Sequence, residues 1–270
     1  MIPKKSLGQH FLADPHLLGR IVDALAPAPG EIVIEIGPGQ GDLTRLLALR
    51  GVRLVAIEKD RRLAAELTGS VTREAGDVTI VEGDALTLDW HALLPIPHPS
   101  SPVPAFAVIG NIPYNITSPL LEKALTPPLP SRIVFLVQKE VADRIVAAPG
   151  SKTYGGLSVG IQAVCRAERL FTVKAGAFRP PPKVDSAVVR LTPLAVPVVA
   201  PDAVRGFRAF VTACFSRRRK QLRNVLAGVL GREPGAVAEG LRGLGLDPTT
   251  RPERLGPADF ARLLLWSRQL

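Results

Sequence analysis

Residues 32–47 read Ile-Val-Ile-Glu-Ile-Gly-Pro-Gly-Gln-Gly-Asp-Leu-Thr-Arg-Leu-Leu, the pattern of a strand, a glycine-rich turn and the start of a helix. Glycines let such a turn bring its backbone close to a ligand at the open end of a parallel sheet. The third glycine, Gly41, follows the first by four positions rather than the five of the dinucleotide-binding fingerprint. The stretch predicts an α/β fold with a ligand site at this turn, and its spacing disfavours a phosphate cradle.

Acidic side chains follow the next two predicted strands. The strand at 53–57 ends at Glu58, where an acid would bind the two hydroxyls of an unphosphorylated ribose. The strand at 78–81 leads to Asp84, which can accept a hydrogen bond from an adenine amino group. Either acid alone is also typical of a solvated strand end, but consecutive strand ends of an open α/β sheet meet at one crevice. Adenosine recognition without a phosphate signal indicates S-adenosylmethionine.

A fourth strand end carries Gly110-Asn111-Ile112-Pro113-Tyr114, directly after the apolar run at 105–109. An exocyclic amine on a purine is a poor nucleophile, because its lone pair is delocalised into the ring. If the Asn111 side-chain oxygen and the Ile112 carbonyl accept from that amine, its nitrogen becomes pyramidal toward an electrophile. Pro113 stiffens the turn and Tyr114 can stack on the base. The same residue types also occur in ordinary turns, so the functional interpretation needs the upstream strand ends as support.

Together these motifs resemble those of the KsgA-type ribosomal RNA adenine dimethyltransferases and, more distantly, those of the Erm resistance methyltransferases. The matching segments follow the family order over nearly the whole chain, at residues 6–12, 35–41, 58, 83–85, 111–114, 138–140, 154–158 and 178–186. The resemblance implies a Rossmann-like class I S-adenosylmethionine-dependent methyltransferase sheet with a small C-terminal helical domain. It also implies N6,N6-dimethylation of adjacent adenosines near the 3′ end of small-subunit (16S) ribosomal RNA, in the immature 30S subunit.

Site residues also follow from the resemblance. The implied cofactor contacts are His10, Leu12, Gly37, Gly39, Glu58, Asp84, Ala85 and Asn111. Many relatives have Asn at the position of His10, which leaves open whether its side chain contacts the cofactor or packs locally. The implied catalytic residues are Asn111, Ile112, Pro113, Tyr114 and Phe178. We expect the extruded adenine to lie between Tyr114 and Phe178, which would offset part of the unstacking cost; the alternative for Phe178 is ordinary packing.

Length and composition agree with two domains of unequal size. A chain of 270 residues with 46% apolar content can bury one substantial α/β core and form a small second domain. Further strands are expected at 132–137 and 186–191, as the antiparallel pair that the resemblance implies. Prolines interrupt residues 192–201, and helical spacing then recurs at 204–215, 222–230 and 260–266. We therefore predict a catalytic, cofactor-binding domain over 1–195 and a helical RNA-binding domain over 196–270.

Positive charge is concentrated in the second domain and favours a polyanionic partner. The chain has a formal charge of +10 and a pI near 10.2. Residues 202–270 carry +7 of this formal charge, because they contain thirteen Lys and Arg residues and six Asp and Glu residues. The cluster expected to contact RNA phosphates, from one helix, comprises Arg217, Arg218, Arg219, Lys220 and Arg223. The alternative is that this run is plain solvated surface.

Other features limit the cellular setting. Two isolated cysteines fit a reducing cytoplasm, and we expect both to be buried packing residues. The N-terminus lacks the apolar segment of a signal peptide, and no apolar stretch is long enough to span a membrane.

The four histidines show no ligand spacing, so we expect no metal. The proline-rich stretch at 94–104 is interpreted as a surface loop, and the resemblance implies a monomer.

Three alternative functions remain at this point. An Erm-like enzyme would modify large-subunit RNA, although the close match at 178–186 and the full helical tail favour the small-subunit type. A DNA adenine methyltransferase should carry a base-reading domain, and none is evident. A non-catalytic RNA-binding assembly factor, or a transcription factor derived from this family, is disfavoured by intact Gly37, Glu58, Asp84 and Asn111.

Overall fold

The polypeptide divides into two units, each formed by two separate stretches of the chain. The structure is a computed structural model that describes residues 9–74, 77–95, 104–217 and 219–269. One unit takes the described residues up to Ala142 together with Glu168–Pro193, and the other takes Asp143–Ala167 and the chain from Leu194 onward. The predicted boundary at 195/196 lies close to this second division. The sequence did not indicate that residues 143–167 group with the C-terminal part.

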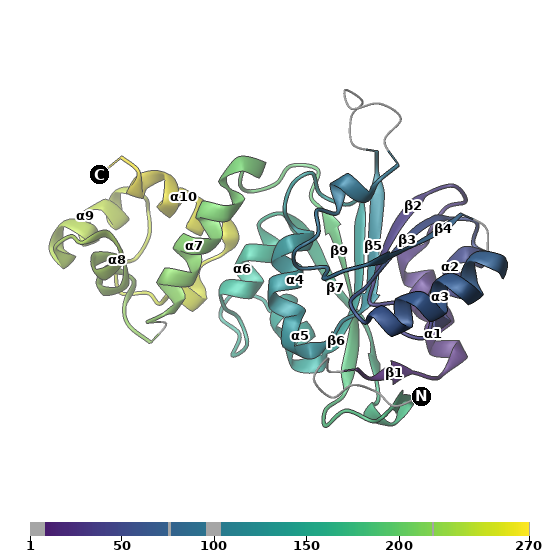
Figure 1. Cartoon of the computed structure of the whole chain (residues 1–270). Coiled ribbons are helices and arrows are strands. Elements are labelled where there is room, and N and C mark those ends of the chain that lie inside the picture. Colours follow the sequence, from purple (N-terminus) through teal and green to yellow (C-terminus); the bar gives the residue numbers. More distant parts are fainter. Residues whose placement is uncertain (1–8, 75–76, 96–103, 218, 270) are drawn as a thin grey trace. The chain divides into compact units, whose positions relative to one another are not determined.

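Among the described residues, a seven-stranded sheet has the order β4-β3-β2-β5-β6-β9-β7 (Figure 1). Strands β4, β3, β2, β5 and β6 are parallel, and β9 pairs antiparallel with β6. The strands are β2 (Ile32–Ile36), β3 (Arg53–Glu58), β4 (Val78–Glu82), β5 (Phe106–Asn111), β6 (Arg132–Gln138), β7 (Cys165–Val173) and β9 (Ser186–Pro193). The central strands are continuous runs of buried apolar residues, as expected of parallel strands covered on both faces.

Helices α1 (Pro15–Leu25), α2 (Asp42–Leu49) and α3 (Arg61–Glu74) contribute to the main apolar core of the sheet. Helix α1 begins at Asp14, whose side chain accepts hydrogen bonds from the backbone N–H groups of His16 and Leu17. Its residues Ile21 and Leu25 are almost fully buried, and each buried aliphatic side chain contributes about 1.5–3 kcal/mol. Helices α4 (Thr117–Ala124) and α5 (Lys139–Ile145) follow β5 and β6.

A second, two-stranded pairing joins the two ends of this unit. Strand β1 (Phe11–Leu12) pairs antiparallel with β8 (Phe178–Arg179), so that Leu12 lies opposite Phe178. Both of these side chains belong to the apolar core. The pairing therefore fixes the segment that precedes α1 beside the segment that precedes β9.

The other unit is helical. Its helices are α6 (Gly156–Gln162), α7 (Val204–Phe215), α8 (Leu222–Leu230), α9 (Pro234–Gly243) and α10 (Pro257–Ser267). Short 3-10 turns in the two units lie at His91–Leu93, Tyr114–Ile116, Ala175–Ala177, Pro201–Ala203 and Pro252–Arg254. Phe207 and Phe260 are fully buried in this core, and the Tyr154 hydroxyl donates to the Leu255 carbonyl at 2.9 Å. Cys165 and Cys214 are free and buried, as predicted, and burial raises the pKa of each thiol to about 12.

The predicted strands, the helix predicted after the glycine turn and the three helices predicted in the C-terminal part are all present, with boundaries shifted by no more than three residues. Strands β1, β7 and β8 and helices α1, α6 and α9 were not predicted. One expectation was wrong, because the basic cluster does not lie on a single helix. Helix α7 ends at Phe215 and α8 begins at Leu222, so Arg217, Arg219 and Lys220 lie between the two helices, where the Lys220 N–H donates to the Arg217 carbonyl. Four adjacent cations repel one another and gain nothing from helical spacing.

Some predictions fall outside the described residues. Arg218 of the basic cluster lies there, as do residues 6–8 of the first matching segment and most of the proline-rich stretch at 94–104.

Candidate active site

The glycine turn between β2 and α2 is held in a conformation that side chains would disturb. Gly37, Gly39 and Gly41 all have positive φ, at 67°, 59° and 82°. A Cβ on Gly39 would lie 2.9 Å from the Phe11 ring, and one on Gly41 would lie 2.4 Å from Leu67. The turn therefore packs closely against its neighbours and leaves backbone, rather than side chains, facing the end of the sheet.

Glu58 is fixed at the end of β3 by two backbone hydrogen bonds. Its carboxylate accepts from the Gly39 N–H at 3.0 Å and from the Asp60 N–H at 2.8 Å, and the residue is 5% exposed. Burial raises the pKa of Glu58, and these backbone hydrogen bonds partly oppose that shift. The carboxylate thus ties the glycine turn to β3 and keeps lone pairs for further donors.

Asp84 follows β4 and forms an ion pair with Lys59. Its carboxylate contacts the Lys59 ammonium at 2.7 Å and accepts from the Leu86 N–H at 2.9 Å. The hydrogen bond from Lys59 is the largest cause that lowers the pKa of Asp84, followed by the bond from Leu86. Asp84 is therefore an ionised acceptor, and Lys59 is a cationic neighbour that the sequence interpretation did not identify.

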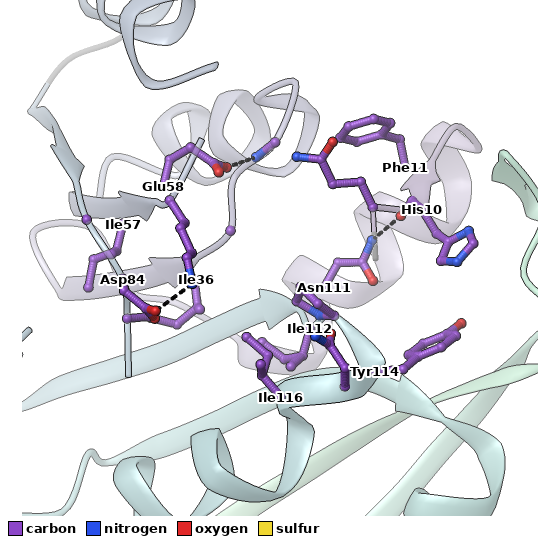
Figure 2. A pocket seen from close by; sticks show the side chains of 18 residues that line it. His10, Phe11, Ile36, Ile57, Glu58, Asp84, Asn111, Ile112, Tyr114 and Ile116 are labelled. Carbon is purple, nitrogen blue, oxygen red and sulfur yellow. Dashed lines mark hydrogen bonds and ion pairs between the residues drawn. The ribbon is translucent and has the colours of Figure 1, made fainter. Parts of the chain in front are cut away.

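Asn111 ends β5, and its side-chain amide has one defined orientation. The Asn111 Nδ2 donates to the His10 carbonyl oxygen at 2.9 Å (Figure 2). A carbonyl only accepts, so the amide nitrogen must face His10 and Oδ1 is the atom left for another donor. Gly110 allows β5 to lie close to β2 just before Asn111, because a Cβ there would lie 2.6 Å from the Ile36 carbonyl oxygen of β2.

Tyr114 lies one turn beyond Asn111 and stacks against an imidazole. The ring of His10 lies 5.7 Å from that of Tyr114, between centroids, with 25° between the planes. The Tyr114 and Ser186 hydroxyls share a hydrogen bond of 2.6 Å. Burial raises the pKa of the Tyr114 hydroxyl. The phenol is therefore neutral and anchored at its hydroxyl.

One cavity brings most of the predicted site residues together (Figure 2). The predicted residues that line it are His10, Gly37, Gly39, Glu58, Asp84, Ala85, Asn111, Ile112, Pro113 and Tyr114. Gln9, Phe11, Ile36, Ile57, Lys59, Gly83, Asn115 and Ile116 complete the lining. All of them come from the segment before α1 and from the carboxyl ends of β2, β3, β4 and β5, as the strand-end argument predicts.

Two predicted residues do not reach this cavity. Phe178 is fully buried, and Leu12, which pairs with it, is 4% exposed. Leu12 instead lines a small neighbouring cavity behind the glycine turn. The structure therefore places the Phe178 ring in the apolar core and not in the lining of this cavity, because β8 pairs with β1 and turns this side chain inward.

Glu35 is a buried acid that the sequence interpretation did not single out. It is 1% exposed, lines the small cavity behind the glycine turn, and burial raises its pKa to about 8. The Thr44 hydroxyl favours the charged form, but Glu35 Oε2 makes no hydrogen bond among the described residues. In the sequence, Glu35 is the one polar residue of the apolar run Ile32–Ile36, and this exception could have identified it as a buried acid.

The sheet with its antiparallel β9, and the acid-lined cavity at the carboxyl ends of its parallel strands, define a class I S-adenosylmethionine-dependent methyltransferase. The model of the family described as "Ribosomal RNA adenine dimethylase" matches residues 3–264. The chain belongs to this family of methyltransferases. The predicted family, fold class, enzyme class and cofactor are thereby confirmed.

Relatives and solved structures match over almost the full chain. It is 47% identical over 262 residues to "Ribosomal RNA small subunit methyltransferase A" of Xanthomonas campestris pv. campestris (strain B100), covering 96% of this chain and 94% of that protein. A dimethyladenosine transferase from Plasmodium falciparum is similar with a TM-score of 0.77 and 26% identity, covering 96% and 98% of the two chains. The 23S rRNA methyltransferase ErmE is similar with a TM-score of 0.72 and 28% identity, covering 96% and 100%.

Two further observations concern the described residues only. Within them, no helix has the length and apolar character needed to cross a bilayer. The same residues contain no group of three or more His, Cys, Asp or Glu side chains that could hold a metal ion.

Proposed function

We propose that this enzyme dimethylates N6 of adjacent adenosines near the 3′ end of small-subunit ribosomal RNA. The observation that carries the proposal is the orientation of the Asn111 amide. Because Nδ2 donates to the His10 carbonyl, Oδ1 is available to accept a hydrogen bond from an adenine amine. We assign the second acceptor to the Ile112 carbonyl, in a turn that Pro113 stiffens, and base stacking to Tyr114.

The cavity fits a cationic nucleoside cofactor. The glycine turn lines the cavity with Gly37 and Gly39, which carry no side chain, and the carboxylates of Glu58 and Asp84 face the same cavity. We assign the ribose hydroxyls to Glu58 and the adenine amine of the cofactor to Asp84. S-adenosylmethionine supplies a methyl group on a positively charged sulfur. The protein's own contribution is to orient the target amine and to polarise it toward that carbon, which needs no covalent enzyme intermediate.

The helical unit is assigned to RNA binding. Arg217, Arg219 and Lys220 are exposed in the turn between α7 and α8, and Arg223 lies on α8. Cations at such positions neutralise RNA phosphates and position the substrate without reading its sequence. A cytoplasmic, monomeric protein that acts on the immature 30S subunit remains our prediction.

The Erm-like alternative is less favoured. Identity to the small-subunit relative is 47%, against 28% to ErmE, although both comparisons cover 96% of this chain. An assembly factor without activity has no need of an oriented Asn111 acceptor beside two cofactor-facing acids. Such a binding role could accompany catalysis.

The test is methyl transfer from labelled S-adenosylmethionine to three substrates, namely unmodified small subunits, large subunits and DNA, followed by mapping of the modified base. We expect dimethyladenosine in small-subunit RNA only.

Asn111→Ala should fold normally and lower turnover by about 100- to 1000-fold, as expected for loss of one oriented polar group in the transition state. Glu58→Ala should instead weaken cofactor affinity, measured by calorimetry. Near-normal methylation by folded Asn111→Ala would refute the assigned roles.

A further inference from the structure

The loop that follows β4 carries two residues of the cavity and turns directly after them. Asp84 and Ala85 line the cavity. The Asp84 carbonyl accepts from the backbone N–H groups of Thr87 and Leu88, both at 3.0 Å. The Asp84 carboxylate in turn accepts from the Leu86 N–H at 2.9 Å. The position of this carboxylate therefore depends on the position of the Leu86 backbone.

Leu86 is held from its other side by a lysine of α4. Lys123 lies in the last turn of that helix and is half-buried, and its Nζ donates to the Leu86 carbonyl at 3.0 Å. Hydrogen bonds from a charged donor are stronger than those between neutral groups. Both backbone groups of Leu86 are thus bonded, the N–H to Asp84 and the carbonyl to Lys123, so that a side chain of α4 fixes the loop.

Trp90 supports the same arrangement. Its indole Nε1 donates to the Ala85 carbonyl at 2.9 Å, and the residue is 4% exposed. The Lys123 ammonium lies over the Trp90 ring, 5.8 Å from its centroid, which is within the range of a cation–π contact. Two successive carbonyls, those of Ala85 and Leu86, therefore accept from side chains that contact each other.

Lys123 also acts on Asp84 through its charge. The hydrogen bond from Lys59 is the largest cause that lowers the pKa of Asp84, followed by the bond from Leu86, and the charge of Lys123 acts in the same direction. Lys123 is not among the residues that line the cavity. Its interactions therefore reach the cavity through the loop that carries Asp84.

We propose that Lys123 is a positioning residue for S-adenosylmethionine, which holds the Asp84 carboxylate in place through Leu86 and thereby raises the affinity for the cofactor. The proposal rests on the proposed function, in which Asp84 accepts from the adenine amine of the cofactor. An acceptor that already has its binding orientation loses less conformational freedom when the cofactor binds. Lys123 therefore contributes to cofactor binding and not to the methyl-transfer step.

The experiment measures affinity for S-adenosylmethionine by calorimetry without RNA, and kcat for methylation of unmodified small subunits at saturating cofactor. Lys123→Met keeps an unbranched side chain of similar length and removes the ammonium. It should bind the cofactor about 3- to 30-fold more weakly, as expected for loss of one hydrogen bond from a charged donor, with kcat within about 2-fold of wild type. Lys123→Gln, which is polar but shorter, should show the same loss, and it replaces Lys123→Met if that variant does not fold.

Lys174→Met is the matched control. Lys174 belongs to the same unit, donates a side-chain hydrogen bond to Asp185 at 2.9 Å, and is not among the residues that line the cavity. This variant should bind the cofactor as wild type does. Binding equal to that of wild type by the Lys123 variants as well would overturn the proposal.

A double-mutant cycle tests whether Lys123 acts through Asp84. Asp84→Asn alone should weaken cofactor binding, and adding Lys123→Met to it should cause a further loss of less than about 2-fold. A fully additive loss would overturn the proposal. If Asp84→Asn binds the cofactor as tightly as wild type, the assignment of Asp84 fails and the proposal fails with it. If wild type binds the cofactor but does not methylate small subunits, the proposed function fails, and the affinities still decide the role of Lys123.

Discussion

Replacement of Glu35 by Gln should remove a pH dependence of stability that arises from one buried carboxyl group. Burial raises the pKa of Glu35 from 4.5 to about 8, whereas the same residue in the unfolded chain ionises near its ordinary value. Between those two values the unfolded state binds one proton fewer than the folded state. The free energy of unfolding therefore falls as pH rises through this window, by about 1.4 kcal/mol per pH unit from this group.

The magnitude is large enough to measure by thermal unfolding. From pH 5.5 to 7.5 the Glu35 contribution changes by about 3 kcal/mol, which corresponds to a Tm difference of about 5–10 °C in a protein of this size. Gln has nearly the same shape as protonated Glu and does not ionise. The stability of Glu35→Gln relative to wild type should therefore increase steadily from pH 5.5 to 7.5, measured on the protein without cofactor.

Glu66→Gln is a suitable control, because Glu66 is exposed on α3. Its Tm curve should run parallel to that of wild type. If the curve of Glu35→Gln also runs parallel to wild type over this range, then Glu35 is ionised in the folded protein. In that case the argument that burial outweighs the Thr44 hydroxyl is refuted.

Two further predictions concern the backbone under the site and the basic cluster. Gly110→Ala should lower the free energy of unfolding by about 1–3 kcal/mol and reduce methyl transfer, because the new Cβ would meet the Ile36 carbonyl at 2.6 Å. Gly19→Ala, on α1 with no neighbour within 4 Å, should instead stabilise by about 0.5–1 kcal/mol, and equal thermal shifts in the two would contradict this reasoning. Replacing Arg217, Arg219 and Lys220 by Gln should lower the slope of log affinity against log salt by about 0.7–0.9 for each RNA phosphate that these cations neutralise. An unchanged slope would identify the cluster as plain surface.

The cavity could be predicted from the sequence because its main residues are placed by a topological rule. Glu58 and Asn111 each end a parallel strand and Asp84 follows another, and such ends meet at one edge whatever the conformation of the loops between them. Local pattern was sufficient for each strand, since the apolar runs have clear polar or glycine boundaries. The same rule made the glycine turn recognisable as part of the site.

What the sequence could not predict depends on interactions between distant segments. Phe178 is buried by the β1 pairing with β8, a long-range pairing for which no local pattern exists. Strand β7 (Cys165–Val173) was missed because its charged residues break the apolar pattern, as an edge strand allows. Helix α9 was missed because Pro234 and three glycines within Pro234–Gly243 lower its helix propensity, and the burial of Val237 and Leu241 compensates.

The two sides of the cavity are therefore organised by different means. On the cofactor side, Glu58 is fixed by backbone N–H groups of Gly39 and Asp60, in the turns that follow β2 and β3, so the folded sheet with these two turns is sufficient to form it. On the base side, the orientation of Asn111 requires the His10 carbonyl, and that carbonyl is placed by the β1 pairing with β8. A folded sheet alone would bind the cofactor but would leave the Asn111 amide free to rotate. The acceptor for the target amine is thus set by an interaction made outside the sheet, which explains why cofactor affinity and methyl transfer should respond to different substitutions.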